Sequence, residues 1–176
     1  MSLRHRLLLI ALLGLPLVAL DAANLAHAQV VAIGASNTAG TGPSGGGVMQ
    51  SEAYPAQLEK LLRARGLNVS VKNAGVPGIT TAMMLASLDS AVDAGTKVVI
   101  INPGVPNDIR RGGTALDAQR NVAEMSHRLK ARGIKVIILH TPSFPQDTRE
   151  GEHYNAKGHA IVAAKLLPQV MAALRR

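Results

Sequence analysis

The stretch "VVAIGASNTAG" (residues 30–40) begins as a run of small and β-branched apolar residues and becomes polar directly after Gly34. The apolar part is typical of a buried strand, and the polar part places Ser36 at the tip of that strand. Two further runs, "KVVIIN" (97–102) and "KVIILH" (135–140), have no polar face. Strands of this kind occur in parallel sheets that helices cover on both sides. The pattern therefore predicts a buried parallel sheet.

Segments with helical periodicity alternate with these strands along the chain. A fourth strand is expected at residues 69–73, and helices are expected at residues 51–66, 80–92, 114–133 and 155–174. Thr114 is the expected N-cap of the third helix. This alternation predicts an α/β domain with a parallel, doubly wound sheet. Such sheets bind ligands beyond the carboxyl ends of their strands, so a functional site is expected in the loops there.

Residues 1–28 have the layout of a secretory signal peptide. Basic residues come first, an apolar run follows at residues 7–20, and the small-residue pattern "AHA" ends at Ala28. The apolar run is short for a membrane span, so no stable span is expected after cleavage, although an uncleaved anchor is the alternative. We predict cleavage after Ala28, one domain over residues 29–176, and a periplasmic or secreted location.

Composition narrows the possible partners. The formal net charge is +8, but the 19 lysines and arginines are scattered rather than gathered in blocks, which favours a solvated surface. With no tryptophan and one phenylalanine, the chain lacks an aromatic platform for nucleic acid. The absence of cysteine excludes disulfides and thiolate chemistry. The histidines and carboxylates lack the spacing of metal ligands on one element, so no metal site is expected.

A serine nucleophile needs a base within hydrogen-bond reach and a third group that orients this base. Ser36 lies at a strand end, where a hydroxyl can be both exposed and rigidly held. His153 lies three residues after Glu150, so a carboxylate and an imidazole share one short turn before the last helix. We therefore predict Ser36, His153 and Glu150 as the catalytic residues. Asp147 is the alternative acid.

Four short blocks of the chain resemble the motifs of the SGNH (GDSL-like) hydrolase family of esterases, lipases and lysophospholipases. In chain order they are "GASNTAG" (34–40), "NAGVPGITT" (73–81), "PGVPND" (103–108) and "EGEHYNAKGH" (150–159). The resemblance implies that Ser36 is the nucleophile and His153 the base. It also implies an oxyanion hole formed by the backbone N–H groups of Ser36 and Gly78 and by the side chain of Asn107. The implied fold is a flavodoxin-like, three-layer α/β/α domain with strand order 2-1-3-4.

The chain departs from the family pattern inside these blocks. Ala35 stands where the family has an aspartate before the nucleophile, and Ile79 stands where an aspartate often follows the glycine of the second block. Pro106 adds a residue to the third block, which makes Asn102 an alternative oxyanion donor. The final acid is Glu150 in place of aspartate. A non-catalytic binding protein on the same fold would show departures of this kind, and it is one alternative reading.

The segment between His140 and His153 is too short for the family's last strand and the helix before it. Four core strands are therefore expected. We predict an exported serine esterase, a monomer, that cleaves small-molecule or lipid-like carboxylic esters through an acyl-enzyme on Ser36. The resemblance implies neither a cofactor nor a metal. Acyl transfer to a sugar hydroxyl is a second alternative, because transfer and hydrolysis share the acyl-enzyme.

Overall fold

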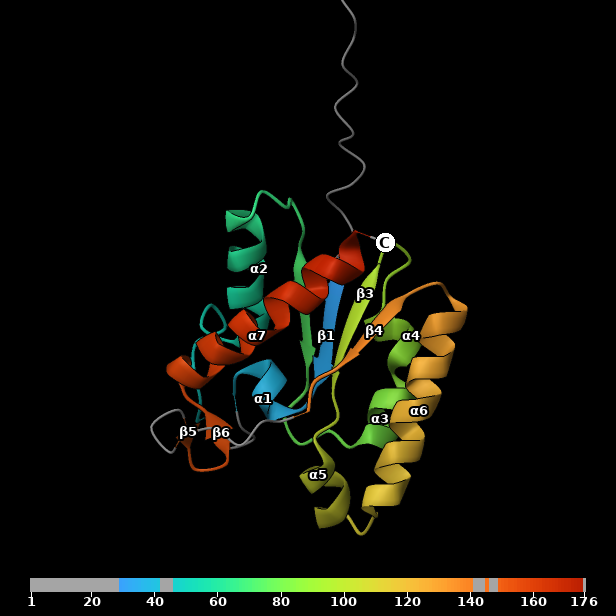
Figure 1. The fold of residues 1–176 in the computed structure, drawn as a ribbon. Helices are drawn as coiled ribbons and strands as arrows, with labels where there is room; N and C mark the ends of the chain where they lie inside the picture. The colour runs from blue at the N-terminus through green and yellow to red at the C-terminus, as the bar shows by residue number, and fades with distance from the viewer. Residues whose placement is uncertain (1–28, 42–45, 141–144, 146–148, 176) are drawn as a thin grey trace, which may run out of the picture.

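The structure is a computed structural model that describes residues 29–41, 46–140, 145 and 149–175. Its centre is a four-stranded parallel sheet. The strands are β1 (Val30–Gly34), β2 (Val71–Gly75), β3 (Val98–Asn102) and β4 (Lys135–Ile138). They lie in the order β2-β1-β3-β4, which confirms the predicted order (Figure 1).

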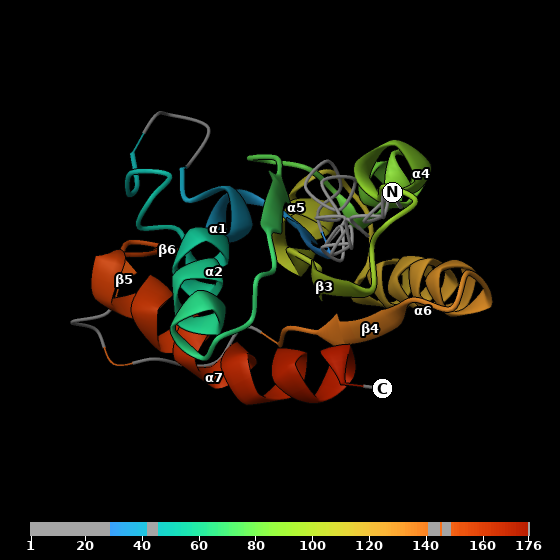
Figure 2. The ribbon, with the colours of Figure 1, turned by 90° about the horizontal axis from the view of Figure 1, so that it is seen from above.

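Helices cover both faces of this sheet (Figures 1 and 2). They are α1 (Ser36–Ala39), α2 (Tyr54–Ala64), α3 (Thr81–Ala86), α4 (Leu88–Ala91), α5 (Val105–Arg110), α6 (Ala115–Ala131) and α7 (Ala156–Leu174). Val30 and Ala32 of β1 pack under α2 and α7, whereas Val31 and Ile33 pack under α3, α4 and α6. Because successive side chains of a strand point to opposite faces, this fully buried strand supplies two separate cores. The three-layer α/β/α architecture is as predicted.

The helix expected at residues 80–92 is in fact two helices, α3 and α4, which are separated at Ser87. The Ser87 hydroxyl donates a hydrogen bond to the carbonyl oxygen of Met83 at 2.9 Å. A serine that bonds back to the preceding turn in this way competes with the regular helical pattern. By contrast, α6 begins as predicted, with Thr114 and Asp117 forming a capping box.

Strand β2 begins at Val71, two residues after the expected start, because its register with β1 pairs Val71 with Val30. At the other end of the pair, Gly75 lies opposite Gly34. A Cβ atom on Gly75 would lie 2.2 Å from the backbone nitrogen of Ala39, so only glycine lets α1 pack against this strand. The glycine thus allows the short helix after β1 to lie close to the sheet.

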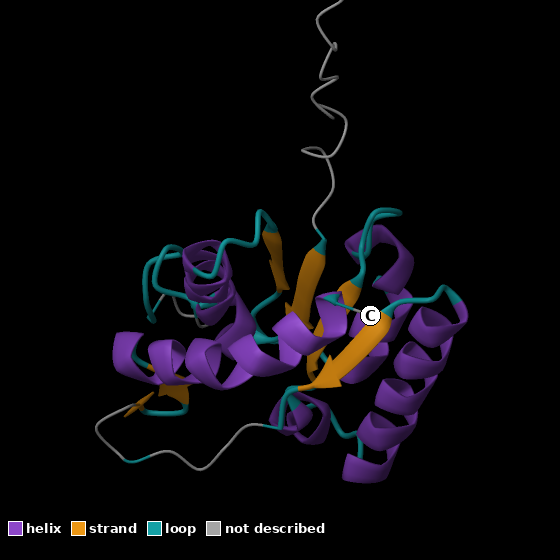
Figure 3. Cartoon of the chain, turned by 45° about the horizontal axis from the view of Figure 1, so that its top comes forward, coloured by secondary structure: helices purple, strands orange, loops and turns teal. Residues whose placement is uncertain are grey.

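Short elements gather at the carboxyl ends of the strands, and the sequence did not predict them. Helix α1 follows β1, and α5 follows β3 (Figure 1). A hairpin of β5 (Arg149–Glu150) and β6 (His153–Tyr154) precedes α7 and lies outside the main sheet (Figure 3). These elements carry the residues that the sequence singled out.

The predicted signal peptide, residues 1–28, lies outside the described residues. Within the described part of the chain, none of the helices combines the length and the apolar character that crossing a membrane requires.

Candidate active site

Ser36 is held at the first turn of α1, directly beyond the carboxyl end of β1. The chain turns sharply at Gly34, where a Cβ atom would lie 2.2 Å from the Thr38 hydroxyl and 2.9 Å from the carbonyl oxygen of Asn102. Ala35, which replaces the family's aspartate, is buried and serves as the N-cap of α1 without a side-chain hydrogen bond. The turn therefore depends on the glycine and on backbone bonds.

His153 lies next to Ser36 in space although the two are far apart in the sequence. Its Nε2 is 2.9 Å from the Ser36 hydroxyl oxygen, which is hydrogen-bond distance. His153 opens β6 of the hairpin and is half-buried. This geometry allows a proton to pass directly from the serine to the imidazole.

Asn37 forms a second link between the same two elements, and sequence reasoning missed it. The Asn37 side-chain oxygen accepts a hydrogen bond from the backbone N–H of Tyr154 at 3.0 Å. In the sequence this asparagine has the character of an ordinary turn residue, and no local pattern points to Tyr154 as its partner.

A cavity of about 650 Å³ opens beside Ser36. Its lining includes Ser36, Gly78, Asn102, Asn107 and His153. The structure therefore brings together around one cavity the residues that the sequence named as nucleophile, base and oxyanion donors. Gly78 has a φ of 74°, a left-handed conformation that favours glycine.

Asn107 has one amide hydrogen engaged and its side-chain oxygen occupied. Its Nδ2 donates to the carbonyl oxygen of Ile79 at 3.0 Å, and its Oδ1 accepts from Arg110 at 3.4 Å. These two contacts define which end of the amide carries the donors. Asn107 lines the cavity, and within the described residues its Nδ2 has one acceptor, so a second hydrogen is available for a ligand.

The inserted Pro106 fits the start of α5. It lies in the first turn of the helix, where a missing N–H removes no helical hydrogen bond. Gly104 precedes it in a left-handed conformation, with a φ of 59°, and a Cβ atom there would lie 2.9 Å from the Cβ of Ala35. The extra residue is thus absorbed where α5 begins, and Asn107 still lines the cavity.

Asp108 links α5 to the neighbouring helices through hydrogen bonds. Sequence reasoning gave this residue no role. Its buried carboxylate accepts hydrogen bonds from the Thr81 backbone N–H at 3.1 Å and from the Thr81 hydroxyl at 2.6 Å. Asn121 of α6 donates to the same hydroxyl at 3.0 Å. The network ties α5 to α3 and α6, so it holds the segment that carries Asn107.

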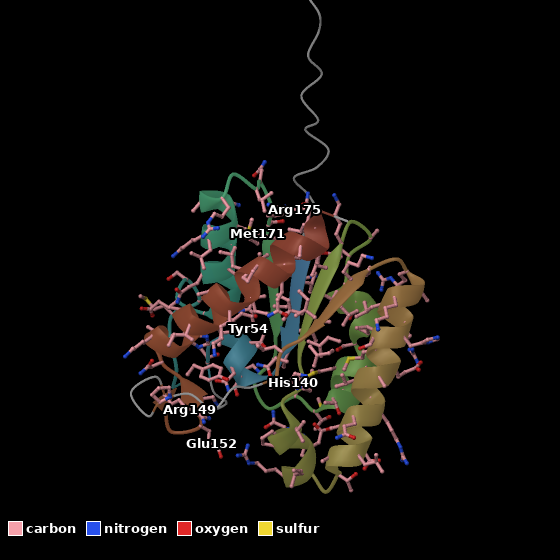
Figure 4. All side chains as sticks on the ribbon, viewed as in Figure 1. Tyr54, His140, Arg149, Glu152, Met171 and Arg175 are labelled. Carbon is pink, nitrogen blue, oxygen red and sulfur yellow. The ribbon has the colours of Figure 1, made fainter. Side chains whose placement is uncertain are left out.

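Charged side chains also line the cavity, and Figure 4 shows two of them, Arg149 and Glu152. Arg110 of α5 forms an ion pair with Glu152 in the hairpin turn, and both side chains are more than half exposed. Arg149 of β5 donates to the backbone oxygen of Glu152 at 2.8 Å and lies over the Tyr154 ring. His140 also lines the cavity and is exposed. The ion pair spans the cleft between the helix that carries Asn107 and the hairpin that carries His153.

Glu150 and Asp147 are the two candidate acids. The backbone of Glu150 pairs directly with that of His153 across the hairpin. The side chain of Glu150 and the whole of Asp147 lie outside the described residues.

His159 does not reach the cavity. It is 1% exposed in α7, and its Nδ1 accepts a hydrogen bond from the Tyr54 backbone N–H at 3.2 Å. Burial lowers the pKa of His159 to about 4, and the charge of Glu52 acts in the opposite direction. A neutral ring is what this bond requires, because an acceptor nitrogen carries no proton.

Comparison with known proteins confirms the family that the sequence motifs predicted. Residues 32–166 match the GDSL-like Lipase/Acylhydrolase family. The esterase TesA of Pseudomonas aeruginosa is 31% identical over 93 residues, which are 53% of this chain and 46% of TesA. The aligned region therefore spans about half the length of this curated relative.

Solved structures agree with the fold. A crystal structure of TesA has a TM-score of 0.70 at 22% identity and covers 82% of this chain and 98% of TesA. The structure of AlinE4, an SGNH-hydrolase family esterase, has a TM-score of 0.54 at 28% identity. The aligned region covers 82% of this chain and 72% of the AlinE4 chain. The TesA structure confirms the predicted fold, and the family match extends over most of the sheet and its helices. The chain belongs to the GDSL-like lipase/acylhydrolase family.

Proposed function

We propose that this chain is a serine esterase that cleaves carboxylic esters through an acyl-enzyme on Ser36. The observation that carries the proposal is the 2.9 Å contact between the Ser36 hydroxyl and His153 Nε2 at the edge of the cavity. Membership in a family of lipases and acylhydrolases supports the same reaction class. Small or lipid-like esters are the proposed substrates.

In the proposed reaction, the Ser36 oxygen attacks the ester carbonyl carbon while His153 Nε2 takes the hydroxyl proton. The carbonyl oxygen becomes an oxyanion, which the backbone N–H groups of Ser36 and Gly78 and the free amide hydrogen of Asn107 stabilise. The imidazolium of His153 then protonates the leaving alcohol, and an acyl-enzyme remains. Water, deprotonated by His153, attacks this acyl group; the bond between the acyl carbon and the Ser36 oxygen breaks, His153 returns the proton to Ser36, and the acid is released. Asn102, which also lines the cavity, is the alternative side-chain donor.

We assign the orientation of His153 to Glu150. The backbone register supports this assignment, because Glu150 and His153 lie directly opposite each other in the hairpin. Directly opposed residues of an antiparallel pair are those whose side chains can interact. A carboxylate that accepts the Nδ1 proton keeps Nε2 available for Ser36 and stabilises the imidazolium. Asp147 is the alternative acid.

The test is a panel of nitrophenyl esters of increasing acyl length, together with labelling by a fluorophosphonate probe. We expect turnover and labelling of the wild type, and loss of both in Ser36→Ala. Ser90→Ala is the matched control, because Ser90 is an exposed serine on α4 away from the cavity. A wild type that neither turns over esters nor becomes labelled would favour a non-catalytic binding protein. Acylated product in the presence of sugar acceptors would favour the transferase.

We also propose that the protein is exported and that residues 1–28 are removed after Ala28. The order of basic, apolar and small residues in this segment supports the proposal. Mass spectrometry of the protein outside the cytoplasm should find an N-terminus at Gln29. Recovery of only the full-length chain from the cytoplasm would contradict it.

A further inference from the structure

We propose that Asn37 is a positioning residue that holds the hairpin β5–β6 in place, so that His153 stays aligned with Ser36. The inference rests on the proposed function, because the alignment matters only if His153 acts as the base. Asn37 does not touch the reacting atoms, and it acts through the backbone of the residue that follows His153.

The hairpin cannot hold His153 in place by itself. Each of its strands has two residues, and it pairs with neither edge of the main sheet. An isolated two-stranded hairpin is at best marginally stable in water. The position of His153 must therefore come from contacts between the hairpin and the rest of the protein.

Tyr154 provides the side-chain part of this attachment. Its ring is 1% exposed and packs edge-on against His159 of α7, with ring centroids 5.7 Å apart. This packing anchors one end of β6 against α7. It does not by itself set the position of the β6 backbone relative to α1.

Asn37 attaches the backbone of the hairpin to α1. Ser36 and Asn37 are consecutive in α1, and His153 and Tyr154 are consecutive in β6. The two pairs are joined by contacts of 2.9 and 3.0 Å. A single contact leaves a hairpin free to pivot about it, whereas two adjacent contacts restrict both distance and orientation. The Asn37 bond therefore limits how far His153 can rotate away from Ser36.

The two contacts respond differently to catalysis. The bond between Ser36 and His153 changes its donor and acceptor when the proton moves. The bond from the Tyr154 N–H to the Asn37 amide oxygen involves no titratable group, so it persists through every step. A displacement of about 1 Å can lower a rate by about 10²-fold, so a constant attachment beside the moving proton has a large effect.

Two substitutions at the same position test this role. Asn37→Leu keeps a similar size and removes the acceptor, whereas Asn37→Asp keeps an acceptor oxygen. For Asn37→Leu we expect kcat on a soluble nitrophenyl ester to fall by about 10- to 100-fold with KM nearly unchanged. For Asn37→Asp we expect kcat within about 3-fold of the wild type, with the acid limb of the pH–rate profile moved to higher pH, because the new carboxylate favours the imidazolium.

Asn73→Leu is the matched control. The Asn73 side-chain oxygen also accepts from a backbone N–H at 3.0 Å, that of Gly75 in the same strand, and its Nδ2 donates to the carbonyl oxygen of Ala39 in α1 at 3.4 Å. Among the described residues, Asn73→Leu therefore removes contacts within β2 and between β2 and α1 but none between α1 and the hairpin. We expect this variant to lower the thermal midpoint while kcat and the pH profile stay near those of the wild type. A purely structural role for Asn37 would give the same pattern as Asn73.

Hydrogen exchange of the Tyr154 amide follows the bond without any turnover. We expect it to be slow in the wild type and in Asn37→Asp, and fast in Asn37→Leu. An active wild type whose Asn37→Leu variant keeps full kcat would overturn the inference, as would an Asn37→Asp variant as impaired as Asn37→Leu. An inactive wild type would instead contradict the proposed esterase function. Failure of that proposal can therefore be distinguished from failure of the inference about Asn37.

Discussion

The two sides of the cavity are built in different ways. Ser36 and Asn107 lie in helices that directly follow β1 and β3, strands that are buried over their whole length. His153 lies on a hairpin outside the sheet, attached through Tyr154, the Asn37 bond and the exposed ion pair between Arg110 and Glu152. The proposed nucleophile and oxyanion donor thus derive their rigidity from the sheet, whereas the proposed base depends on a few contacts. The base side is therefore where small changes should alter catalysis most.

The largest expected effect is at Glu150, the proposed acid on the hairpin. Glu150→Gln should keep the fold and lower kcat by about 10³- to 10⁴-fold, because an amide no longer fixes the tautomer of His153 or stabilises its charge. Asp147→Asn is the paired variant and should change kcat little. Steady-state kinetics of both variants, with circular dichroism as the folding check, decides between the acids. The reverse order would move the acid to Asp147, and two small effects would indicate a dyad.

On the sheet side, Asn107→Ala should lower kcat by about 10²- to 10³-fold, which is typical for the loss of one oxyanion donor. KM should change little, because the lost bond forms mainly in the transition state. Asn102→Ala, assayed in parallel, is the comparison. If Asn107→Ala turned over esters at the wild-type rate, Asn102 would become the side-chain donor.

A third prediction concerns acid stability and His159, which packs beneath the hairpin. Burial lowers the pKa of His159 to about 4 in the folded protein, below the ordinary histidine value of 6.5. Between these values the unfolded chain binds more protons, so stability should fall as the pH falls from about 6.5 toward 4. The loss should approach about 3 kcal/mol. Urea unfolding across this pH range measures it.

His159→Asn separates this effect from other titrations, because its side-chain oxygen can replace Nδ1 as acceptor for the Tyr54 N–H. The variant should be less stable at neutral pH, since it loses the ring packing with Tyr154, but its stability should depend less on pH between 4 and 6.5. An unchanged slope would assign the acid sensitivity to another group.

The smallest expected effect is at the ion pair across the cleft. Arg110 and Glu152 are both exposed, and exposed pairs contribute about 0–1 kcal/mol. Glu152→Gln should therefore change the free energy of unfolding by less than about 1 kcal/mol, and 0.5 M salt should remove most of the difference. A larger, salt-resistant loss would mean that the ion pair, rather than Asn37, is the main attachment of the hairpin.

The regular parts of the fold could be predicted from local patterns. The unbroken apolar run of β1 indicated a strand buried on both faces, and Thr114 marked the start of α6. The motif around Ser36 predicted a polar site at the carboxyl edge of the sheet. The break at Ser87 could not be predicted in the same way, because serine occurs both within helices and at their ends.

The sequence by itself determined the fold class, the strand order implied by the family motifs, and the residue types placed after each strand. Periodicity and turn preference are local properties, so they can be detected in a single chain. Only the tertiary structure joined Asn37 to Tyr154, which is 117 residues away, and Asp108 to Thr81, which is 27 residues away. These partners are set by how helices and hairpin pack on the sheet, and no local pattern encodes a hydrogen bond between distant segments.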